Sequence, residues 1–304
     1  MNYIEEIKKL KREKNAVILA HCYQNVEIDE VADYVGDSLY LSQMAEKTDA
    51  DIIIFAGVYF MAQTAKILNP NKKVILPNLK AGCEMADMIN LQQLREFKSK
   101  YPNIPTVCYI NSTAEVKSEC DICCTSSNAI KIVKSLNAKK VLFLPDRNLG
   151  KWVEKQLGNV EVITYNGCCP IHDKLDPQGI KETKLKYPNA IVLAHPECKE
   201  EFSSQADYVG STTGILNYVK NSNENKFIIA TEKGVIDRLK RDYPEKQFYS
   251  IYDTPSICAS MKLNSLLDIY YALKNETPEI QVEPELAKKA IKCINRMLEA
   301  SKWE

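Results

Sequence analysis

Short hydrophobic runs recur along the chain at a fixed spacing. Residues 16–21 read AVILAH and residues 190–195 read AIVLAH, so the second run begins 174 residues after the first. The same spacing, without a gap, aligns ADYVG at residues 32–36 with the identical ADYVG at residues 206–210. Two matches at one offset indicate an internal duplication, and overlooking such a repeat would lead to a wrong fold assignment.

A weaker third copy lies halfway between these two. Residues 106–109 align with residues 18–21 at an offset of 88, and the same offset places Ser126 on Ser38. In each copy a buried-strand pattern ends in two polar residues separated by one residue, and a hydroxyl follows 17 residues after the first of them. These positions are His21-x-Tyr23 with Ser38, Tyr109-x-Asn111 with Ser126, and His195-x-Glu197 with Thr212.

The apolar and polar pattern between these points predicts the other elements of each copy. A second strand is expected at residues 51–57, 139–146 and 226–232, and a third at residues 74–77, 160–165 and 247–252. Helical patterns separate the strands at residues 38–47, 127–136 and 213–220. Alternating strands and helices predict an α/β fold with three pseudo-symmetric three-layer αβα units, each with a small parallel sheet, around a central active site.

The repeat divides the chain near residues 87 and 174. We expect a first αβα repeat at residues 1–87, a second at residues 88–174, and a third with a C-terminal helix at residues 175–304. The C-terminal helix is indicated by one apolar face after Pro284, formed by Leu286, Ala290, Ile291, Ile294, Met297 and Leu298.

Charge and hydropathy exclude several classes of partner. Forty basic and forty acidic residues give a formal net charge of zero, whereas proteins that bind nucleic acid or anionic membranes usually carry a basic excess. The longest mostly apolar run, residues 52–62, is about half of the roughly 20 residues that a membrane helix needs. Residues 1–14 are charged and lack the apolar stretch of a signal peptide. We therefore expect a cytoplasmic protein whose partners are small molecules.

The glycine and cysteine content limits the kinds of binding site that the chain can contain. The chain has only ten Gly, and none lies in a dinucleotide-binding or P-loop pattern. It has eleven Cys, an odd number. Because disulfides are rare in the cytoplasm, this surplus favours metal binding, catalysis or buried thiols.

Three cysteine positions follow the repeat. A Cys comes after the third predicted strand of each copy: Cys83, the Cys168-Cys169 doublet and Cys258. Functional side chains of parallel α/β units gather at the carboxyl ends of strands, so threefold packing would bring these thiols together. Three thiolates suit an iron–sulfur cluster with one iron free of protein ligands, and such an iron can act as a Lewis acid. The alternative is three buried thiols without a metal.

Short motifs spread along the whole chain are together highly specific. They are AHCYQ at residues 20–24, ADYVGDS at 32–38, GC at 82–83 with MAD at 85–87, YIN at 109–111, CTSSNA at 124–129, PDRNLG at 145–150, G-x-C-x-x-H at 167–172, HPEC at 195–198, GSTTG at 210–214, TE-x-G at 231–234 and C-x-x-MK at 258–262. This set resembles the quinolinate synthase family, the iron–sulfur enzymes of de novo NAD biosynthesis.

The resemblance implies an activity and a cofactor. The family condenses iminoaspartate (iminosuccinate) with dihydroxyacetone phosphate to quinolinate, phosphate and water, and its [4Fe–4S] cluster is held by three Cys within three similar αβα units. The family pattern selects Cys169 from the doublet and pairs it with His172, so the implied metal ligands are Cys83, Cys169 and Cys258. Functional coupling to an enzyme that supplies the unstable iminoaspartate is also expected.

The three His of the chain all lie in these motifs. His21 and His195 occupy equivalent repeat positions, and the resemblance implies that both bind substrate. A His, with an ordinary pKa near ~6.5, holds an anion when charged and relays protons when neutral. The alternative for each is a satisfied core or surface His. We expect His172 to support Cys169.

Glu197 is the predicted general base, because the reaction needs proton abstraction beside a carbonyl or imine and two dehydrations. Its alternative is a surface glutamate. The predicted catalytic set is completed by Tyr23, Tyr109 and His195, the tyrosines as donors to developing negative charge. The predicted substrate-binding residues all have side chains that form hydrogen bonds: His21, Ser38, Tyr109, Asn111, Ser126, His195, Glu197 and Thr212. Several lie at predicted helix N-termini, which favour anions. The alternative for each hydroxyl is an ordinary helix N-cap.

Other cysteines receive no iron in this interpretation. Cys120-x-x-Cys123-Cys124 resembles half a zinc site or a redox pair, but no second ligand pair lies at a compatible spacing. We expect an incidental thiol cluster there, with a regulatory disulfide as the alternative. Cys22 and Cys198 flank the substrate motifs and are expected to line the cavity.

Two other functions stay open on the sequence. One is another iron–sulfur hydro-lyase acting on a small hydroxy acid. The other is a non-catalytic redox sensor that carries the same cluster.

Overall fold

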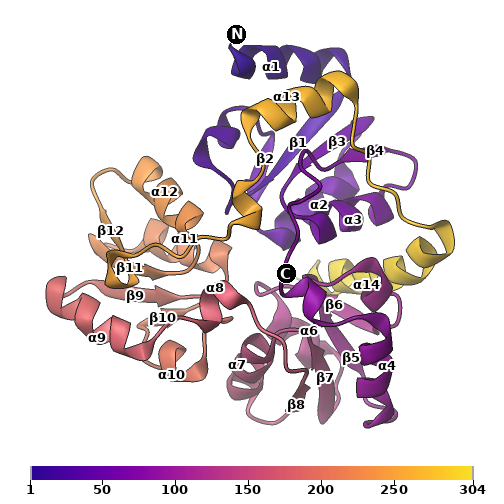
Figure 1. Cartoon of the computed structure of the whole chain (residues 1–304). Coiled ribbons are helices and arrows are strands. Elements are labelled where there is room, and N and C mark those ends of the chain that lie inside the picture. Colours follow the sequence, from indigo (N-terminus) through magenta and orange to yellow (C-terminus); the bar gives the residue numbers. More distant parts are fainter. Residues whose placement is uncertain (1, 303–304) are drawn as a thin grey trace.

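The computed structural model describes residues 2–302, which form three lobes around a common centre (Figure 1). Each lobe contains one four-stranded sheet in which all neighbouring strands are parallel. Helices flank each sheet. The predicted α/β fold of three αβα units is therefore confirmed.

The helices and strands follow one another with the same rhythm in each lobe. The first lobe contains α1 (Tyr3–Glu13), β1 (Ala16–His21), η1 (Val26–Glu30), β2 (Tyr34–Gly36), α2 (Ser38–Lys47), β3 (Ile52–Ala56), α3 (Tyr59–Leu68), β4 (Lys73–Ile75) and η2 (Ala86–Met88). The second contains α4 (Leu91–Ser99), β5 (Thr106–Tyr109), α5 (Ala114–Lys117), β6 (Ile122–Cys124), α6 (Ala129–Ser135), β7 (Lys140–Leu144), α7 (Arg147–Leu157), β8 (Glu161–Thr164) and α8 (Pro170–Asp173). The third contains α9 (Pro177–Lys186), β9 (Ile191–Ala194), α10 (Glu200–Ser203), β10 (Tyr208–Val209), α11 (Thr212–Asn221), β11 (Lys226–Ala230), α12 (Lys233–Asp242), β12 (Gln247–Ser250), η3 (Ile251–Asp253) and η4 (Ser260–Lys262).

The three sheets share one topology. Their strand orders are β2-β1-β3-β4, β6-β5-β7-β8 and β10-β9-β11-β12, so the first long strand of each unit is central. Because helices cover both faces, the central strands are buried on both sides and consist almost entirely of apolar residues. This double burial is the physical origin of the repeated apolar runs.

Each unit has one strand more than the three that the pattern predicts. The additional strands β2, β6 and β10 form one edge of each sheet and contain three, three and two residues. The repeated ADYVG segments contain β2 and β10. Such short segments show no alternation, so periodicity does not detect them.

The C-terminal segment returns to the first two units. Helix α13 (Leu266–Asn275) packs against α1 and β3, and α14 (Pro284–Ser301) packs against α5, β6 and α3 (Figure 1). The predicted C-terminal helix is thus present, with Ala290, Ile294, Met297 and Leu298 buried. Helix α13 was not among the predicted elements. The proposed boundaries at residues 87 and 174 stay a prediction.

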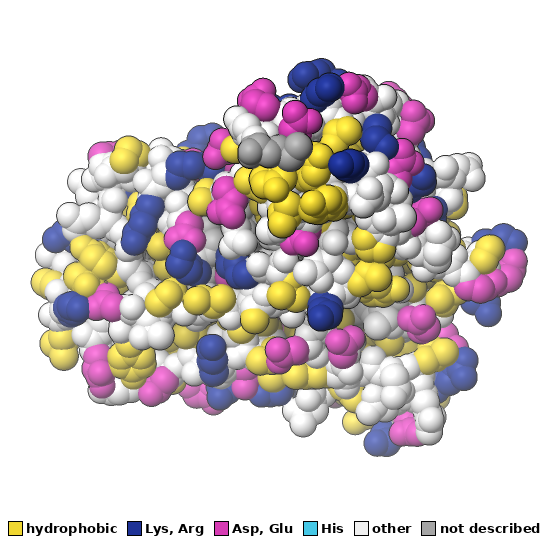
Figure 2. All heavy atoms as spheres, turned by 45° about the horizontal axis from the view of Figure 1, so that its top comes forward, with side chains coloured by type: hydrophobic (Ala, Val, Ile, Leu, Met, Phe, Trp, Pro, Cys, Tyr) yellow, Lys and Arg dark blue, Asp and Glu magenta, His cyan; other side chains and the backbone are white. Residues whose placement is uncertain are grey.

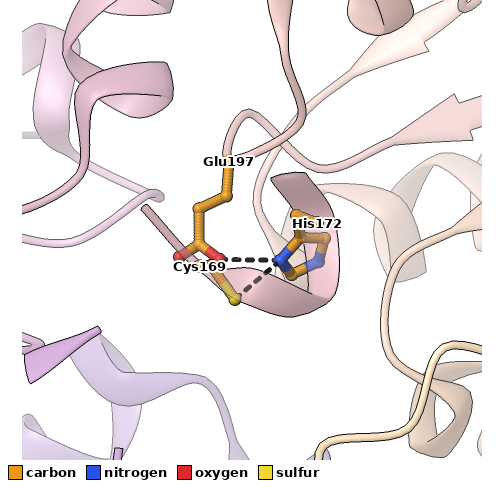
Figure 3. Close-up of side chains that lie close together, drawn as sticks. All are labelled: Cys169, His172 and Glu197. Atoms are coloured by element: carbon orange, nitrogen blue, oxygen red, sulfur yellow. Dashed lines mark hydrogen bonds and ion pairs between the residues drawn. The ribbon is translucent and has the colours of Figure 1, made fainter. Parts of the chain in front are cut away.

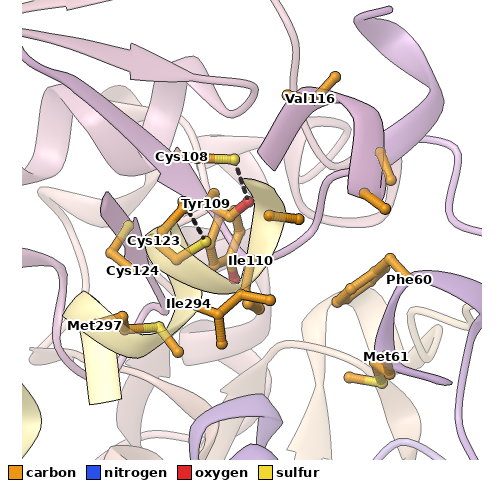
Figure 4. Packing of buried hydrophobic residues seen from close by; sticks show 14 of the residues in the cluster. Phe60, Met61, Cys108, Tyr109, Ile110, Val116, Cys123, Cys124, Ile294 and Met297 are labelled. Atoms are coloured by element: carbon orange, nitrogen blue, oxygen red, sulfur yellow. Dashed lines mark hydrogen bonds between the residues drawn. The ribbon is translucent and has the colours of Figure 1, made fainter. Parts of the chain in front are cut away.

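The first and second units share one hydrophobic core. Figure 4 shows Phe60 and Met61 of α3 near side chains of β5, β6 and α14, and all belong to one cluster of buried residues. Within residues 2–302, every helix is too short or too polar to cross a membrane. On the face drawn in Figure 2, Lys and Arg side chains are interspersed with Asp and Glu, in keeping with the zero net charge.

Candidate active site

One pocket is lined by residues of all three units, at the carboxyl ends of their central strands. His21 ends β1, Tyr109 ends β5 and His195 follows β9. Every residue predicted for the site lines this pocket: His21, Tyr23, Ser38, Cys83, Tyr109, Asn111, Ser126, Cys169, His195, Glu197, Thr212 and Cys258. Parallel sheets place functional side chains at this end, so three repeats packed around one centre assemble a single site.

Cys83, Cys169 and Cys258 reach the pocket from the loops that follow the last strand of each unit, β4, β8 and β12. The backbone N–H of the third residue after each Cys favours its thiolate form. Burial nevertheless raises the pKa of all three thiols, that of Cys83 to about 12. Cys83 also interacts electrostatically with both other thiols. Three convergent sulfurs with backbone donors directed at them form a donor set suited to an iron–sulfur centre.

His21 and His195 are buried and hydrogen-bonded in the same way. In each ring, Nδ1 accepts from the backbone N–H two residues later, of Tyr23 at 3.1 Å and of Glu197 at 3.4 Å. The neutral imidazole therefore carries its proton on Nε2, and Nε2 of His195 lies 3.2 Å from Oγ of Ser126. Burial lowers the pKa of His21 to about 3 and that of His195 to about 4, so both rings are neutral N–H donors at pH 7.

Glu197 is buried and accepts two hydrogen bonds. Its Oε1 accepts from the hydroxyl of Tyr109 at 2.6 Å, and its Oε2 lies 2.8 Å from Nδ1 of His172. Burial alone would raise the pKa of Glu197, but the imidazoles of His195 and His172 and the Tyr109 hydroxyl lower it below the ordinary value. Glu197 is only 4% exposed, so the surface-glutamate alternative is wrong.

Tyr23 connects the first unit to the third. Its hydroxyl lies 3.0 Å from Oγ1 of Thr212 and 2.9 Å from Oγ1 of Thr231. Thr231 also contacts Nε2 of His172 at 2.9 Å, so a continuous polar chain runs from Tyr23 through His172 to Glu197. Burial and then the charge of Glu197 raise the pKa of Tyr23, which keeps its phenol protonated. Burial and the charge of Glu197 likewise raise the pKa of Tyr109.

The predicted hydroxyl and amide groups occupy comparable places. Ser38 is the first residue of α2, Thr212 is the first residue of α11, and Ser126 lies in the loop before α6. Oδ1 of Asn111 is buried and has no hydrogen-bond partner among the described residues. A buried acceptor without a donor is costly, so a donor on a bound ligand would be favoured at this position.

Cys169, His172 and Glu197 form a second candidate ligand set (Figure 3). One ligand atom from each lies within 4.8 Å of the others. Nδ1 of His172 is 3.3 Å from Sγ of Cys169, as expected for a residue that supports this Cys. Cys169 belongs to both this set and the three-cysteine set, which agrees with a metal cofactor at this end of the pocket.

Asp37 lines the pocket but was not among the predicted site residues. Its Oδ2 accepts from Oγ of Ser127 at 2.5 Å and from Oγ1 of Thr213 at 2.6 Å, and its Oδ1 accepts from the N–H of Tyr40 at 3.0 Å. One carboxylate therefore joins all three units beside the predicted hydroxyls. Ser127 and Thr213 occupy the same position of the repeat. Their shared hydroxyl was the sequence feature from which this contact site could have been predicted.

The apolar wall of the pocket was also missed. Val58, Phe60 and Met61 line it from the start of α3. Their sequence pattern is that of an ordinary core helix, so no signal in the sequence distinguishes them.

The Cys120-x-x-Cys123-Cys124 segment does not contribute to the pocket lining. Cys123 and Cys124 lie on β6 in the hydrophobic core (Figure 4). Sγ of Cys123 is 3.0 Å from Sγ of Cys293 on α14. Burial lowers the pKa of the fully buried Lys117, while the neighbouring thiols act in the opposite direction. All cysteines are free, in agreement with a buried thiol cluster.

Cys22 and Cys198 do not line the pocket, contrary to the prediction. Both are nearly fully buried, and Cys198 packs in the hydrophobic core of the third unit. Their sequence neighbours His21 and Glu197 face the pocket, and consecutive side chains diverge from the backbone.

Comparison with known proteins identifies relatives over nearly the whole chain. The family model described as "Quinolinate synthetase A protein" matches residues 5–299. The curated quinolinate synthase of Alkaliphilus metalliredigens (strain QYMF) is 53% identical over 298 residues, which cover 98% of each chain. That of Clostridium novyi (strain NT) is 49% identical over 294 residues, covering 96% of this chain and 97% of the relative. These relatives are enzymes of NAD biosynthesis.

Proposed function

The chain belongs to the quinolinate synthetase A family, and from this premise we propose that it condenses iminoaspartate with dihydroxyacetone phosphate. The products are quinolinate, one phosphate and two water molecules, and the reaction serves NAD biosynthesis. The observation that carries the proposal is the convergence of all the predicted site residues, from three units, on one pocket.

Cys83, Cys169 and Cys258 are the proposed ligands of a [4Fe–4S] cluster. Their fit is supported by partial burial beside the pocket, by mutual electrostatic interaction and by a backbone donor near each sulfur. A cluster held by three Cys supplies, when bound, one iron that can act as a Lewis acid. We propose the cytoplasm as the location, because free thiols and such a cluster need a reducing compartment.

The neutral histidines and the hydroxyls would bind the anionic groups of the substrates. The two substrates together carry two carboxylates and one phosphate. Nε2–H of His21 and of His195 would donate to these oxygens as neutral donors, because burial keeps both pKa values low. Ser38, Ser126 and Thr212 supply further donors around the same pocket. The amide of Asn111 offers both a donor and an acceptor there.

Glu197 is the proposed general base. Glu197 is buried in the pocket wall, and its lowered pKa keeps the carboxylate ionised at neutral pH, as a proton acceptor must be. The Tyr109 hydroxyl at 2.6 Å and Nδ1 of His172 at 2.8 Å orient this carboxylate, so that it is positioned to take one proton from the substrate. Tyr23, held by two threonine hydroxyls, would donate to oxygen that becomes negative during the reaction.

An anaerobic assay with the loaded protein tests the proposal. Iminoaspartate generated in the assay and dihydroxyacetone phosphate should yield quinolinate and phosphate in equal amounts. A protein that holds a cluster but forms no quinolinate would refute the proposal. Dehydration of a different hydroxy acid would then favour the hydro-lyase alternative, and absence of any turnover would favour the redox sensor. Because iminoaspartate is unstable, faster product formation with the enzyme that supplies it would support functional coupling.

A further inference from the structure

The three cysteine loops are fastened by the same backbone hydrogen bond. The first residue of α3, α7 and α12 donates its N–H to the carbonyl two residues before the Cys. These bonds join Tyr59 to Ala81, Arg147 to Gly167 and Lys233 to Ser256, each at 2.8 Å. The three loops therefore share the same backbone hydrogen bond, and differences in how they are held come from side chains.

The residue that precedes each of these helices differs between the units. In the second unit Oδ1 of Asp146 caps α7, and its Oδ2 accepts from the backbone N–H of Cys169 at 3.0 Å. In the third unit Oε2 of Glu232 caps α12, and its Oε1 accepts from the N–H of Cys258 at 3.3 Å. The first unit has Val58 at this position, which offers no acceptor to Cys83.

These two carboxylates are costly features of the fold. Asp146 and Glu232 are both fully buried, and a buried carboxylate is tolerated only when it is well hydrogen-bonded or paired. Glu232 has the ammonium group of Lys262 at 3.2 Å, whereas Asp146 is held by backbone N–H groups. Helix capping alone does not require burial, since Asp176 caps α9 from an exposed position.

We propose that Asp146 and Glu232 are positioning residues that fix the backbones of Cys169 and Cys258, and thereby hold two of the three thiols ready for the cluster. Each carboxylate links the helix start to the Cys through its two oxygens. Cys83 is held by its backbone alone, so the three ligands are unequal although the repeat is threefold. This inference rests on the proposed function, since it presumes that the three Cys bind a cluster.

Asp146→Asn isolates the effect on the Cys loop. Asn caps helices about as well as Asp, so α7 keeps its cap. The amide, however, has one acceptor oxygen and presents an NH₂ group where the second acceptor was, so the bond from Cys169 is lost. Glu232→Gln removes the corresponding bond to Cys258 in the third unit, and it also removes the charge that pairs with Lys262. Asp176→Asn is the matched control, because it alters an aspartate cap that contacts no Cys.

The measurement is the rate at which iron leaves the protein. The full chain is loaded anaerobically, and iron transferred to a ferrous chelator is followed over time for each variant. Loss of a group that orients a metal ligand typically costs roughly 10–100-fold in metal binding, and we expect iron release from D146N to accelerate by that factor. E232Q should show a smaller acceleration because its bond to Cys258 is longer. D176N should match wild type.

The thermal midpoint of the cluster-free protein separates positioning from stability. We expect D146N and D176N to unfold at similar temperatures. Iron release from D146N and E232Q at the wild-type rate would overturn the inference, as would an equal acceleration in D176N. If D146N does not fold, E232Q alone decides between these outcomes. A wild-type protein that binds no iron–sulfur cluster would refute the proposed cofactor itself, which is a distinct result.

Discussion

Replacing Glu197 by Gln removes one buried negative charge from the pocket and leaves the side-chain volume almost unchanged. The carboxylate receives the Tyr109 hydroxyl at 2.6 Å and faces Nδ1 of His172 at 2.8 Å. An amide keeps one of these contacts but does not accept a proton at neutral pH. General-base catalysis contributes roughly 10²–10⁴-fold, so we expect kcat of E197Q to fall by that factor with little change in KM.

The assay compares quinolinate formation per bound iron under anaerobic conditions. Glu200→Gln is the matched control, since its side chain is 62% exposed and pairs with Lys155 at the surface. We expect E200Q to retain wild-type activity and both variants to retain iron. A wild-type kcat in E197Q would refute the assignment of the base. Loss of iron from E197Q would place Glu197 among the metal ligands instead, in the set with Cys169 and His172.

Three further outcomes test the remaining interpretation. Cys258→Ser should lose iron on anaerobic purification, while Cys124→Ser, which alters a core thiol outside the pocket lining, should retain it; the reverse result would refute the ligand assignment. Asp37→Asn should raise KM by about tenfold with unchanged iron content, because it weakens charged hydrogen bonds that join the three units; an unchanged KM would contradict this role. Since burial lowers the pKa of His21 and His195 from 6.5 to about 3 and about 4, the unfolded chain binds more protons than the folded chain below pH 6.5. The free energy of unfolding of the cluster-free protein should therefore fall as pH drops from 6.5 toward 4, by up to ~1.4 kcal/mol per pH unit for each His, and denaturant titrations of the two His→Gln variants should show a shallower fall.

The units of the fold were predictable because burial imposes a local pattern. A strand covered by helices on both faces must be apolar along its length, and that requirement produced the matching runs before His21 and His195. The edge strands β2, β6 and β10 escaped prediction because two or three residues carry too little pattern. Helix α13 escaped because it lies outside the repeat and packs on the first unit, far away in sequence.

The positions that line the pocket were predictable where they follow the repeat. Cys83, Cys169 and Cys258 recur at nearly equal intervals, and each faces the pocket. Asp37 was missed because its role depends on hydrogen bonds from hydroxyls of the two other units, and no local pattern in the first unit reveals these partners. Cys22 was misplaced because the pattern identifies the turn at the strand end but not the direction of each side chain within it.

The sequence by itself determined the threefold α/β repeat, the zero net charge and the residue types that recur at strand ends. It could do so because strand burial and strand-end chemistry are properties of short segments. The tertiary structure alone decided that Glu197 meets Tyr109 and His172, that Asp37 joins three units, and that Asp146 and Glu232 support only two of the three cysteine loops. Each of these contacts joins segments that are distant along the chain, and their separation in space depends on how the units pack.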